Sequence, residues 1–231
     1  FPAHYELLHR KIKKFFKDIQ LQAMLILTPI GIITLILAGK TNFFESSFQF
    51  ISALTTTGFS TVNLANLSEN AKFILSLAMI VGGAAGSTAG GIKLVRLVIL
   101  FRGIGWKLKK AYLPLRSTFP YKFGGKFLLK ENAMEILGEA AVISFLWIIL
   151  LISSTFIVSS STGESFINSF FEVCSAQGGV GLSVGITKLS MARTAKLMLI
   201  LNMLIGRLEI IPFLVLLRSI LQIISRRKGI Y

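Results

Sequence analysis

Two glycine-bearing loops contain the residues of this sequence whose types and spacing best suit a chemical role. One reads Ser-Ala-Leu-Thr-Thr-Thr-Gly-Phe-Ser at 52–60, and the other reads Ser-Ala-Gln-Gly-Gly-Val-Gly-Leu-Ser at 175–183. Glycine allows backbone angles in which consecutive carbonyl groups point the same way, and such carbonyls can replace the hydration shell of a cation. The loops therefore predict a cation filter. Its lining residues would be Thr56, Thr57, Gly58, Phe59, Gly179, Val180, Gly181 and Leu182. The alternative is that the small residues only let two helices approach closely.

The two loops belong to halves of the chain that repeat one another. A shift of 123 positions, without a gap, aligns identical residues before, within and after the loops. The aligned pairs are Phe43 with Phe166, Ser46 with Ser169, Phe48 with Phe171, Ser52 with Ser175, Ala53 with Ala176, Gly58 with Gly181, Ser60 with Ser183, and Gly83 with Gly206. A repeat of this kind predicts one structural unit used twice.

Each unit contains the segments needed to hold such a loop inside a membrane. Uncharged apolar runs at 21–38 and 140–158 are long enough to span a bilayer. The segments 43–56 and 166–177 are too short to span, and segments of that length are often re-entrant. Interrupted apolar stretches follow at 72–101 and 195–217. We therefore expect an all-α membrane protein of two tandem units, each a first span, a pore helix and a second span (M1–pore helix–M2) around a K⁺-channel-like pore.

The interruption in the first unit consists of small residues that do not support a stable helix. Its small residues include Gly82, Gly83, Gly86, Gly90 and Gly91, and each glycine costs a helix about 1 kcal/mol. The second span of the first unit should therefore be broken here, and the segment could order and disorder at little cost. A flexible kink without a gating role is the alternative.

Arg207 interrupts the corresponding stretch of the second unit. A charge at mid-membrane costs about 2.5–3.5 kcal/mol on insertion scales, so Arg207 should face the pore or a buried partner. Glu209 is two residues away and points to a different face of a helix, so it would pair with another helix. A purely structural ion pair is the alternative for Arg207.

Composition and charge agree with a membrane protein. The mean hydropathy is +0.73, 53% of the residues are hydrophobic and 15% are charged. The net charge of +15 comes largely from basic blocks at 10–17, 93–130 and 218–228, which places these blocks in the cytoplasm. We therefore interpret the basic charge as the signal that orients the protein in the membrane, and not as a surface that binds nucleic acid. The single cysteine, Cys174, excludes an internal disulfide.

These motifs resemble the Trk/Ktr/HKT superfamily of potassium transporters. Thr-Thr-Thr-Gly-Phe-Ser at 55–60 and the run Gly-Gly-Ala-Ala-Gly-Ser-Thr-Ala-Gly-Gly-Ile-Lys at 82–93 resemble its third repeat. Ser-Ala-Gln-Gly-Gly-Val-Gly-Leu-Ser at 175–183 and Met-Leu-Ile-Gly-Arg-Leu-Glu-Ile-Ile-Pro at 203–212 resemble the fourth. The start, with His4 and Tyr5, resembles the join between repeats two and three. The chain thus resembles the C-terminal half of a TrkH-like pore subunit.

The resemblance implies domains, a function and partners. The domains would be a cytoplasmic junction at 1–18, the third repeat at 19–103, a basic cytoplasmic linker at 104–133 and the fourth repeat at 134–228. The function would be K⁺ uptake across the plasma membrane, with the 82–91 segment as an intramembrane gate and Arg207 as a positive barrier below the filter. K⁺ would be the only ion at the filter, and no cofactor is expected. The sequence contains no catalytic dyad, metal-ligand cluster or nucleotide-binding loop, so we expect no catalytic residue and no enzyme activity.

The expected partners include two further repeats, absent here, that complete the pore. A second copy of the complete transporter would form a homodimer, and a cytoplasmic ring of nucleotide-binding regulatory subunits of the TrkA/KtrA type would dock on the basic inner face. The lipid bilayer is the remaining partner. The alternatives are a Na⁺-permeable or Na⁺/H⁺-coupled carrier and, from another class, a non-conducting membrane scaffold.

Overall fold

Helices form nearly all of the regular structure in a computed structural model that describes residues 16–39, 41–87, 89–114, 120–208, 215, 218 and 219. The helices are α3 (Ile19–Gly39), α4 (Phe43–Leu54), the 3-10 turn η1 (Leu64–Asn66), α5 (Glu69–Ile80), α6 (Leu94–Ala111), α7 (Lys130–Thr162), α8 (Phe166–Gly178) and α9 (Arg193–Leu208). The predicted junction at His4 and Tyr5, together with Glu209 and most of the basic tail, lies outside the described residues.

Two helices, α3 and α7, are long and apolar enough to cross a membrane. With 33 residues, α7 is about 50 Å long, which exceeds the roughly 30 Å hydrocarbon thickness. Its first turns contain Lys130, Glu131, Glu135 and Glu139, so the uncharged part begins near Ala140. Many apolar side chains of α3 and α7 are exposed, including Leu37 and Phe145, as expected for helices that face lipid or further helices.

The helices α4 and α8 occupy the positions predicted for the two short segments. The Ser165 hydroxyl caps α8 by accepting a hydrogen bond from the Asn168 N–H at 3.3 Å. Beyond Gly178, the left-handed conformation of Gly179 ends this helix (φ 62°), a usual helix stop because glycine has no side chain to strain. At 12 and 13 residues, both helices are about 20 Å long, too short to cross a bilayer.

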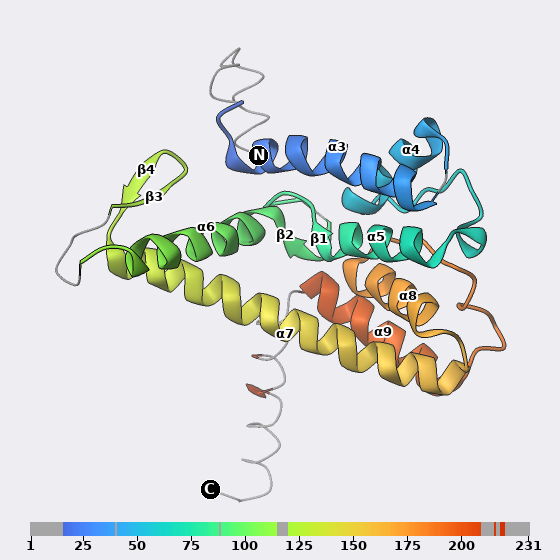
Figure 1. The fold of residues 1–231 in the computed structure, drawn as a ribbon. Helices are drawn as coiled ribbons and strands as arrows, with labels where there is room; N and C mark the ends of the chain where they lie inside the picture. Colours follow the sequence, from blue (N-terminus) through green and yellow to red (C-terminus); the bar gives the residue numbers. More distant parts are fainter. Residues whose placement is uncertain are drawn as a thin grey trace, which may run out of the picture.

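The chain between α5 and α6 is not helical. Its ends are β1 (Val81–Gly82) and β2 (Ile92–Lys93), which pair in parallel with Val81 opposite Ile92. The described glycine-rich residues between them form a loop whose two ends are joined by this strand pair (Figure 1).

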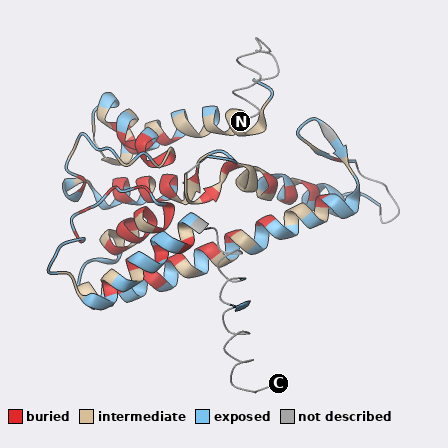
Figure 2. Ribbon diagram, turned by 180° about the vertical axis from the view of Figure 1, so that it is seen from behind, coloured by how far each residue is buried: buried red, intermediate tan, exposed pale blue. Residues whose placement is uncertain are grey.

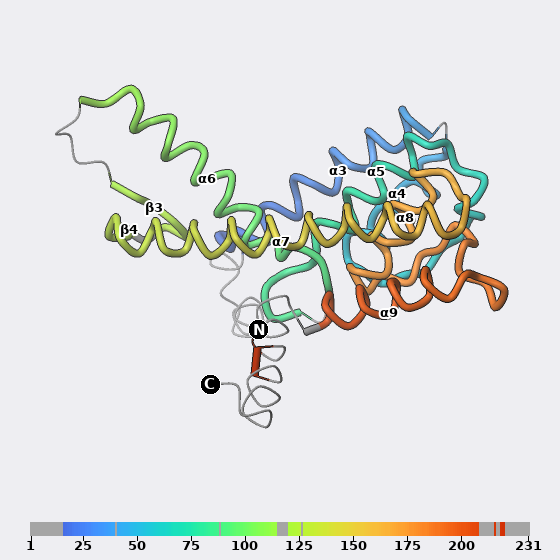
Figure 3. Tube along the Cα trace, turned by 90° about the horizontal axis from the view of Figure 1, so that it is seen from below, coloured from blue at the N-terminus to red at the C-terminus, as the bar shows by residue number. Residues whose placement is uncertain are grey.

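The stretch at 104–133 contains regular structure. Helix α6 continues past residue 103 to Ala111, and a hairpin of β3 (Tyr121–Phe123) and β4 (Lys126–Leu128) precedes α7. At Gly103 the contact with α7 is so close that an added Cβ would lie 2.3 Å from Leu137 Cδ1. Figure 3 shows α6, the hairpin and the start of α7 extending away from the other helices.

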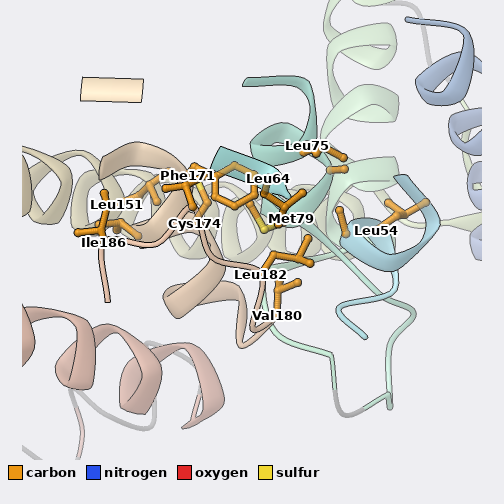
Figure 4. Packing of buried hydrophobic residues seen from close by; sticks show 14 of the residues in the cluster. Leu54, Leu64, Leu75, Met79, Leu151, Phe171, Cys174, Val180, Leu182 and Ile186 are labelled. Atoms are coloured by element: carbon orange, nitrogen blue, oxygen red, sulfur yellow. The ribbon is translucent and has the colours of Figure 1, made fainter. Parts of the chain in front are cut away.

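The core joins the two halves of the chain. Helix α8 packs against α5, α7 and α9, and burial is concentrated on these helices where they meet (Figure 2). The buried cluster includes Met79 from the first half and Phe171, Cys174, Val180 and Leu182 from the second (Figure 4). The buried Lys72 ammonium also links the halves, donating to Ala65 O at 2.9 Å and Asn168 Oδ1 at 3.0 Å.

Candidate functional site

The two predicted filter loops have matching backbone conformations. Thr56 and Gly58 have φ of 55° and 79°, and their equivalents Gly179 and Gly181 have φ of 62° and 97°. Thr56 is the only non-glycine with positive φ among the described residues, and this conformation costs such a residue about 1–2 kcal/mol. The strain at Thr56 thus occurs where the other loop uses glycine.

Hydrogen bonds fasten each loop to the helix before it. Thr57 N donates to Ser52 O at 3.0 Å, and Val180 N donates to Ser175 O at 2.8 Å. The side chains of the two serines hold the next turn, since Ser52 Oγ donates to Phe59 O at 2.6 Å and Ser175 Oγ accepts from Gly181 N at 3.1 Å. Equivalent serines thus fix both loops, although through different groups.

Side chains alternate along the second loop. Val180 and Leu182 are buried in the core, whereas Gly179, Gly181 and Ser183 are exposed. Figure 4 shows Val180 and Leu182 among the core residues. One face of the strand-like segment is therefore anchored, and the other consists of glycine and serine.

The two loops lie against one another at Gly58. A Cβ added there would lie 2.0 Å from the carbonyl oxygen of Val180, far inside any real contact. The sequence analysis singled out both loops but did not predict this contact between them. The structure therefore brings Thr56–Phe59 and Gly179–Leu182 to one place.

The predicted gate residues lie at the end of α8 from which the second loop starts. A Cβ added at Gly90 would lie 2.2 Å from Gly178 O, and one added at Gly82 would lie 1.8 Å from Gly90 O. Gly86 and Gly91 have φ of 81° and 75°, while Gly83 is close to Ala89. This segment is therefore packed against the base of the second loop.

Polar contacts close the same segment. Lys93 Nζ donates to Ser87 O at 3.2 Å and also to Ala89 O. The Gln20 side chain of α3 accepts from Ala85 N at 2.5 Å. Residues 84–87 are nevertheless exposed, so the tip of the loop is less restrained than its base.

Arg207 lies at the end of α9, next to the same region. A Cβ added at its neighbour Gly206 would lie 1.8 Å from Gln177 O in α8. The Arg207 side chain is exposed. The predicted separate pairing of Glu209 lies outside the described residues.

The sequence analysis missed two buried polar residues behind the loops. Glu172 and Gln49 are 3% and 2% exposed and are related by the same shift of 123 positions. Glu172 accepts hydrogen bonds from the last residue of the second loop and from two residues after it. Gln49 Nε2 donates to Thr61 Oγ1 at 3.2 Å. Two features of the sequence could have indicated these residues. They occupy equivalent positions of the two repeats, and each is a polar residue within a short apolar segment.

Two helices long and apolar enough to cross a membrane, together with the two short helices and their loops, indicate a helical membrane protein. The chain belongs to the TrkH family of cation transport proteins, whose family model matches residues 37–223. This is a family of transporters and not of enzymes.

Individual relatives agree with this assignment. The chain is 33% identical over 218 residues to an uncharacterized cation transporter from Methanocaldococcus jannaschii, covering 94% of this chain and 44% of the relative. It is 29% identical over 229 residues to the Trk system potassium uptake protein TrkH of Salmonella typhimurium, covering 94% of this chain and 46% of the relative. Ktr system potassium uptake protein D of Bacillus subtilis is 29% identical over 176 residues, covering 75% of this chain and 36% of that protein.

A solved structure shares the fold. The crystal structure of the potassium transporter TrkH from Vibrio parahaemolyticus matches with a TM-score of 0.72 and 26% identity, covering 87% of this chain and 44% of that chain. The chain thus spans less than half the length of these relatives.

Proposed function

We propose that this chain forms two of the four walls of a pore that carries K⁺ across the cell membrane. The observation that carries the proposal is the contact of Gly58 with the Val180 carbonyl, because it sets two loops of matching backbone side by side. The relatives named as potassium uptake proteins support K⁺ as the ion.

The short helices supply a favourable potential for a cation. The C-terminal end of a helix carries a partial negative charge of about half a unit. Both α4 and α8 end where a loop begins. A cation held by the loop carbonyls would therefore be attracted by two helix ends as well as by the carbonyls.

In this proposal each half is one repeat of span, pore helix and span, with the second span broken in the first repeat. Two more repeats, from the same or another polypeptide, supply the other walls, and complete transporters pair as homodimers. The basic residues of α6 and the hairpin, Arg102, Lys107, Lys109, Lys110 and Lys122, offer a cytoplasmic surface for the regulatory ring.

The experiment that tests K⁺ transport is uptake by the complete transporter in cells that lack their own K⁺ uptake systems. Growth at low K⁺ and saturable ⁸⁶Rb⁺ uptake are expected, with Na⁺ competing weakly. Uptake driven only by Na⁺ would instead support a Na⁺-permeable or coupled carrier. A membrane-inserted protein with no flux of either ion would support a scaffold.

Shortening the tip of the proposed gate should raise transport. Deletion of Ala84–Ser87 removes the contact with Gln20 but keeps Gly82, Gly90 and Gly91, so the base of the loop can still close. Arg207→Ala removes a positive charge near the base of the second loop. We expect each variant to increase ⁸⁶Rb⁺ flux several-fold. The deletion removes part of the segment proposed to obstruct the path, and Arg207→Ala removes a charge that disfavours a cation by about 1 kcal/mol or more.

Arg218→Ala, which removes an exposed arginine beyond α9, is the matched control and should leave the flux unchanged. Unchanged flux in both gate variants would favour a structural kink and a structural arginine.

A further inference from the structure

A buried carboxylate lies behind the second filter loop. Glu172 is in the middle of α8 and is 3% exposed. Its Oε1 accepts hydrogen bonds from Ser183 Oγ at 2.7 Å and Thr187 Oγ1 at 2.8 Å, and its Oε2 accepts one from Val184 N at 3.1 Å. Ser183 Oγ in turn accepts from Gly185 N at 2.9 Å. One carboxylate thus holds the whole turn that follows the loop.

Within the described part of the chain, this carboxylate has no charged hydrogen-bond partner. The three groups that donate to Glu172 there are two hydroxyls and one backbone N–H, all uncharged. A buried charge is normally paired with an opposite charge or with a metal ion. An ionisable side chain within a membrane protein usually marks an ion path for the same reason.

The space beside Glu172 adjoins the second of the two proposed filter loops. A hollow of about 300 Å³ is lined by the polar and small residues Glu172, Ser175, Gly179, Gly181, Ser183 and Thr187, and by apolar residues that include Leu199 and Met203 of α9. The carboxylate and the exposed face of the loop therefore border the same cavity, which is large enough for a cation with part of its hydration shell.

The equivalent position of the first loop holds an uncharged side chain with fewer hydrogen bonds. Gln49 is buried at the matching place on α4, but its single hydrogen bond to Thr61 Oγ1 is longer, at 3.2 Å. Its Oε1 has no hydrogen-bond partner in the described part of the chain. The two walls are therefore unequal, with one braced by a charge and the other by a neutral amide.

We infer that Glu172 is a positioning residue that gives the outer end of the fourth-repeat filter its affinity for monovalent cations. It holds the turn at Ser183–Thr187, and the passing cation provides the positive charge that its neighbours lack. This inference rests on the proposed filter and adds a source of ion affinity outside the carbonyl row.

The test, made in the complete transporter, separates the effect of the Glu172 charge from the effect of its hydrogen bonds to the turn at 183–187. Glu172→Gln keeps the size and acceptor oxygen but removes the charge, so the KM for ⁸⁶Rb⁺ should rise about tenfold, the effect of a unit charge several ångströms away, with a smaller change in maximal rate. Glu172→Asp keeps the charge but shortens the brace, and its KM should stay within about threefold of the original. Gln49→Glu adds a charge at the matching place and should lower the KM.

Glu164→Gln is the control, because it removes an exposed carboxylate whose field is screened by salt. It should not change the KM. A purely structural role predicts that Glu172→Asp is impaired as much as Glu172→Gln and that Gln49→Glu gains nothing, which would overturn the inference. Should Glu172→Gln fail to reach the membrane, an unchanged KM in Gln49→Glu would overturn it too.

The filter proposal fails by a different result. Undiminished uptake by Gly58→Asp would contradict the proposal that the two loops form a filter. Loss of uptake in Gly58→Asp, combined with an unchanged KM in Glu172→Gln, would leave the filter standing and remove only the role of Glu172.

Discussion

A complete transporter that carries Gly58→Ala should lose at least about 99% of its ⁸⁶Rb⁺ uptake. The residue has φ of 79°, where alanine is strained by about 1–2 kcal/mol. The new Cβ would also lie 2.0 Å from Val180 O, so the two loops would have to separate. Each 1.4 kcal/mol is a factor of ten in an equilibrium constant. We expect the backbone strain and the displacement of the Val180 carbonyl together to cost more than two such steps, which corresponds to a loss of more than about a hundredfold. Uptake is compared at equal amounts of protein in the membrane.

Gly181→Ala distinguishes the two causes. Gly181 has φ of 97°, but no atom of the residues that the structure describes lies within 4 Å of an added Cβ. This variant suffers the strain without the clash, so we expect a loss of about tenfold. Gly138→Ala in α7, also in open space, should have full activity. Equal activity in all three variants would show that the loops are helix contacts and not a filter.

The sequence predicted the helices of the membrane region well, because apolar length and charge set them. The runs 21–38 and 140–158 correspond to α3 and α7, and the short segments correspond to α4 and α8. The ends were less predictable. Helix α7 begins ten residues earlier, at Lys130, because its contact with α6 at Gly103 and Leu137 supports a helix beyond the apolar run. No periodicity of hydrophobic residues could indicate that contact.

The two loops could be singled out from the sequence, but their geometry could not. Repeated glycines marked both loops, since few other residues accept positive φ. Thr56 shows the limit of that signal, because it has the conformation of Gly179 without being glycine. Glu172 and Gln49 were missed because a polar residue in a short amphipathic helix is usually exposed, and only tertiary packing reveals that these two are buried.

The two loops need not contribute equally to ion selection. The second is anchored through Val180 and Leu182 and braced by Glu172, whereas Phe59 of the first is 68% exposed. If the loop lines the proposed filter, a side chain so exposed needs a further wall to cover it. The structure therefore supports the proposal that more protein packs next to the first loop.

Residues 1–231 alone should not conduct ions as a monomer. A ring of carbonyls must surround the ion, and this chain supplies two segments of the four proposed. Gly179 and Gly181 are also exposed, so in a bilayer the loop backbone would meet lipid at several kcal/mol for each unsatisfied group. Expression in cells lacking K⁺ uptake should therefore give no growth at low K⁺ and ⁸⁶Rb⁺ uptake at background.

The native mass of the purified chain decides between the ways in which the pore could be completed. Growth with a strictly monomeric species would contradict the four-wall proposal, because two segments would then suffice. Growth with a dimer would instead indicate that two copies pair about a two-fold axis, and Gly58→Asp should abolish that growth, since both copies would lose the same wall. Growth restored only by co-expression of the N-terminal half of a full-length relative would show that separate polypeptides can supply the missing walls. This result is expected if the exposed apolar faces of α3 and α7, which include Leu37 and Phe145, are sites of helix packing.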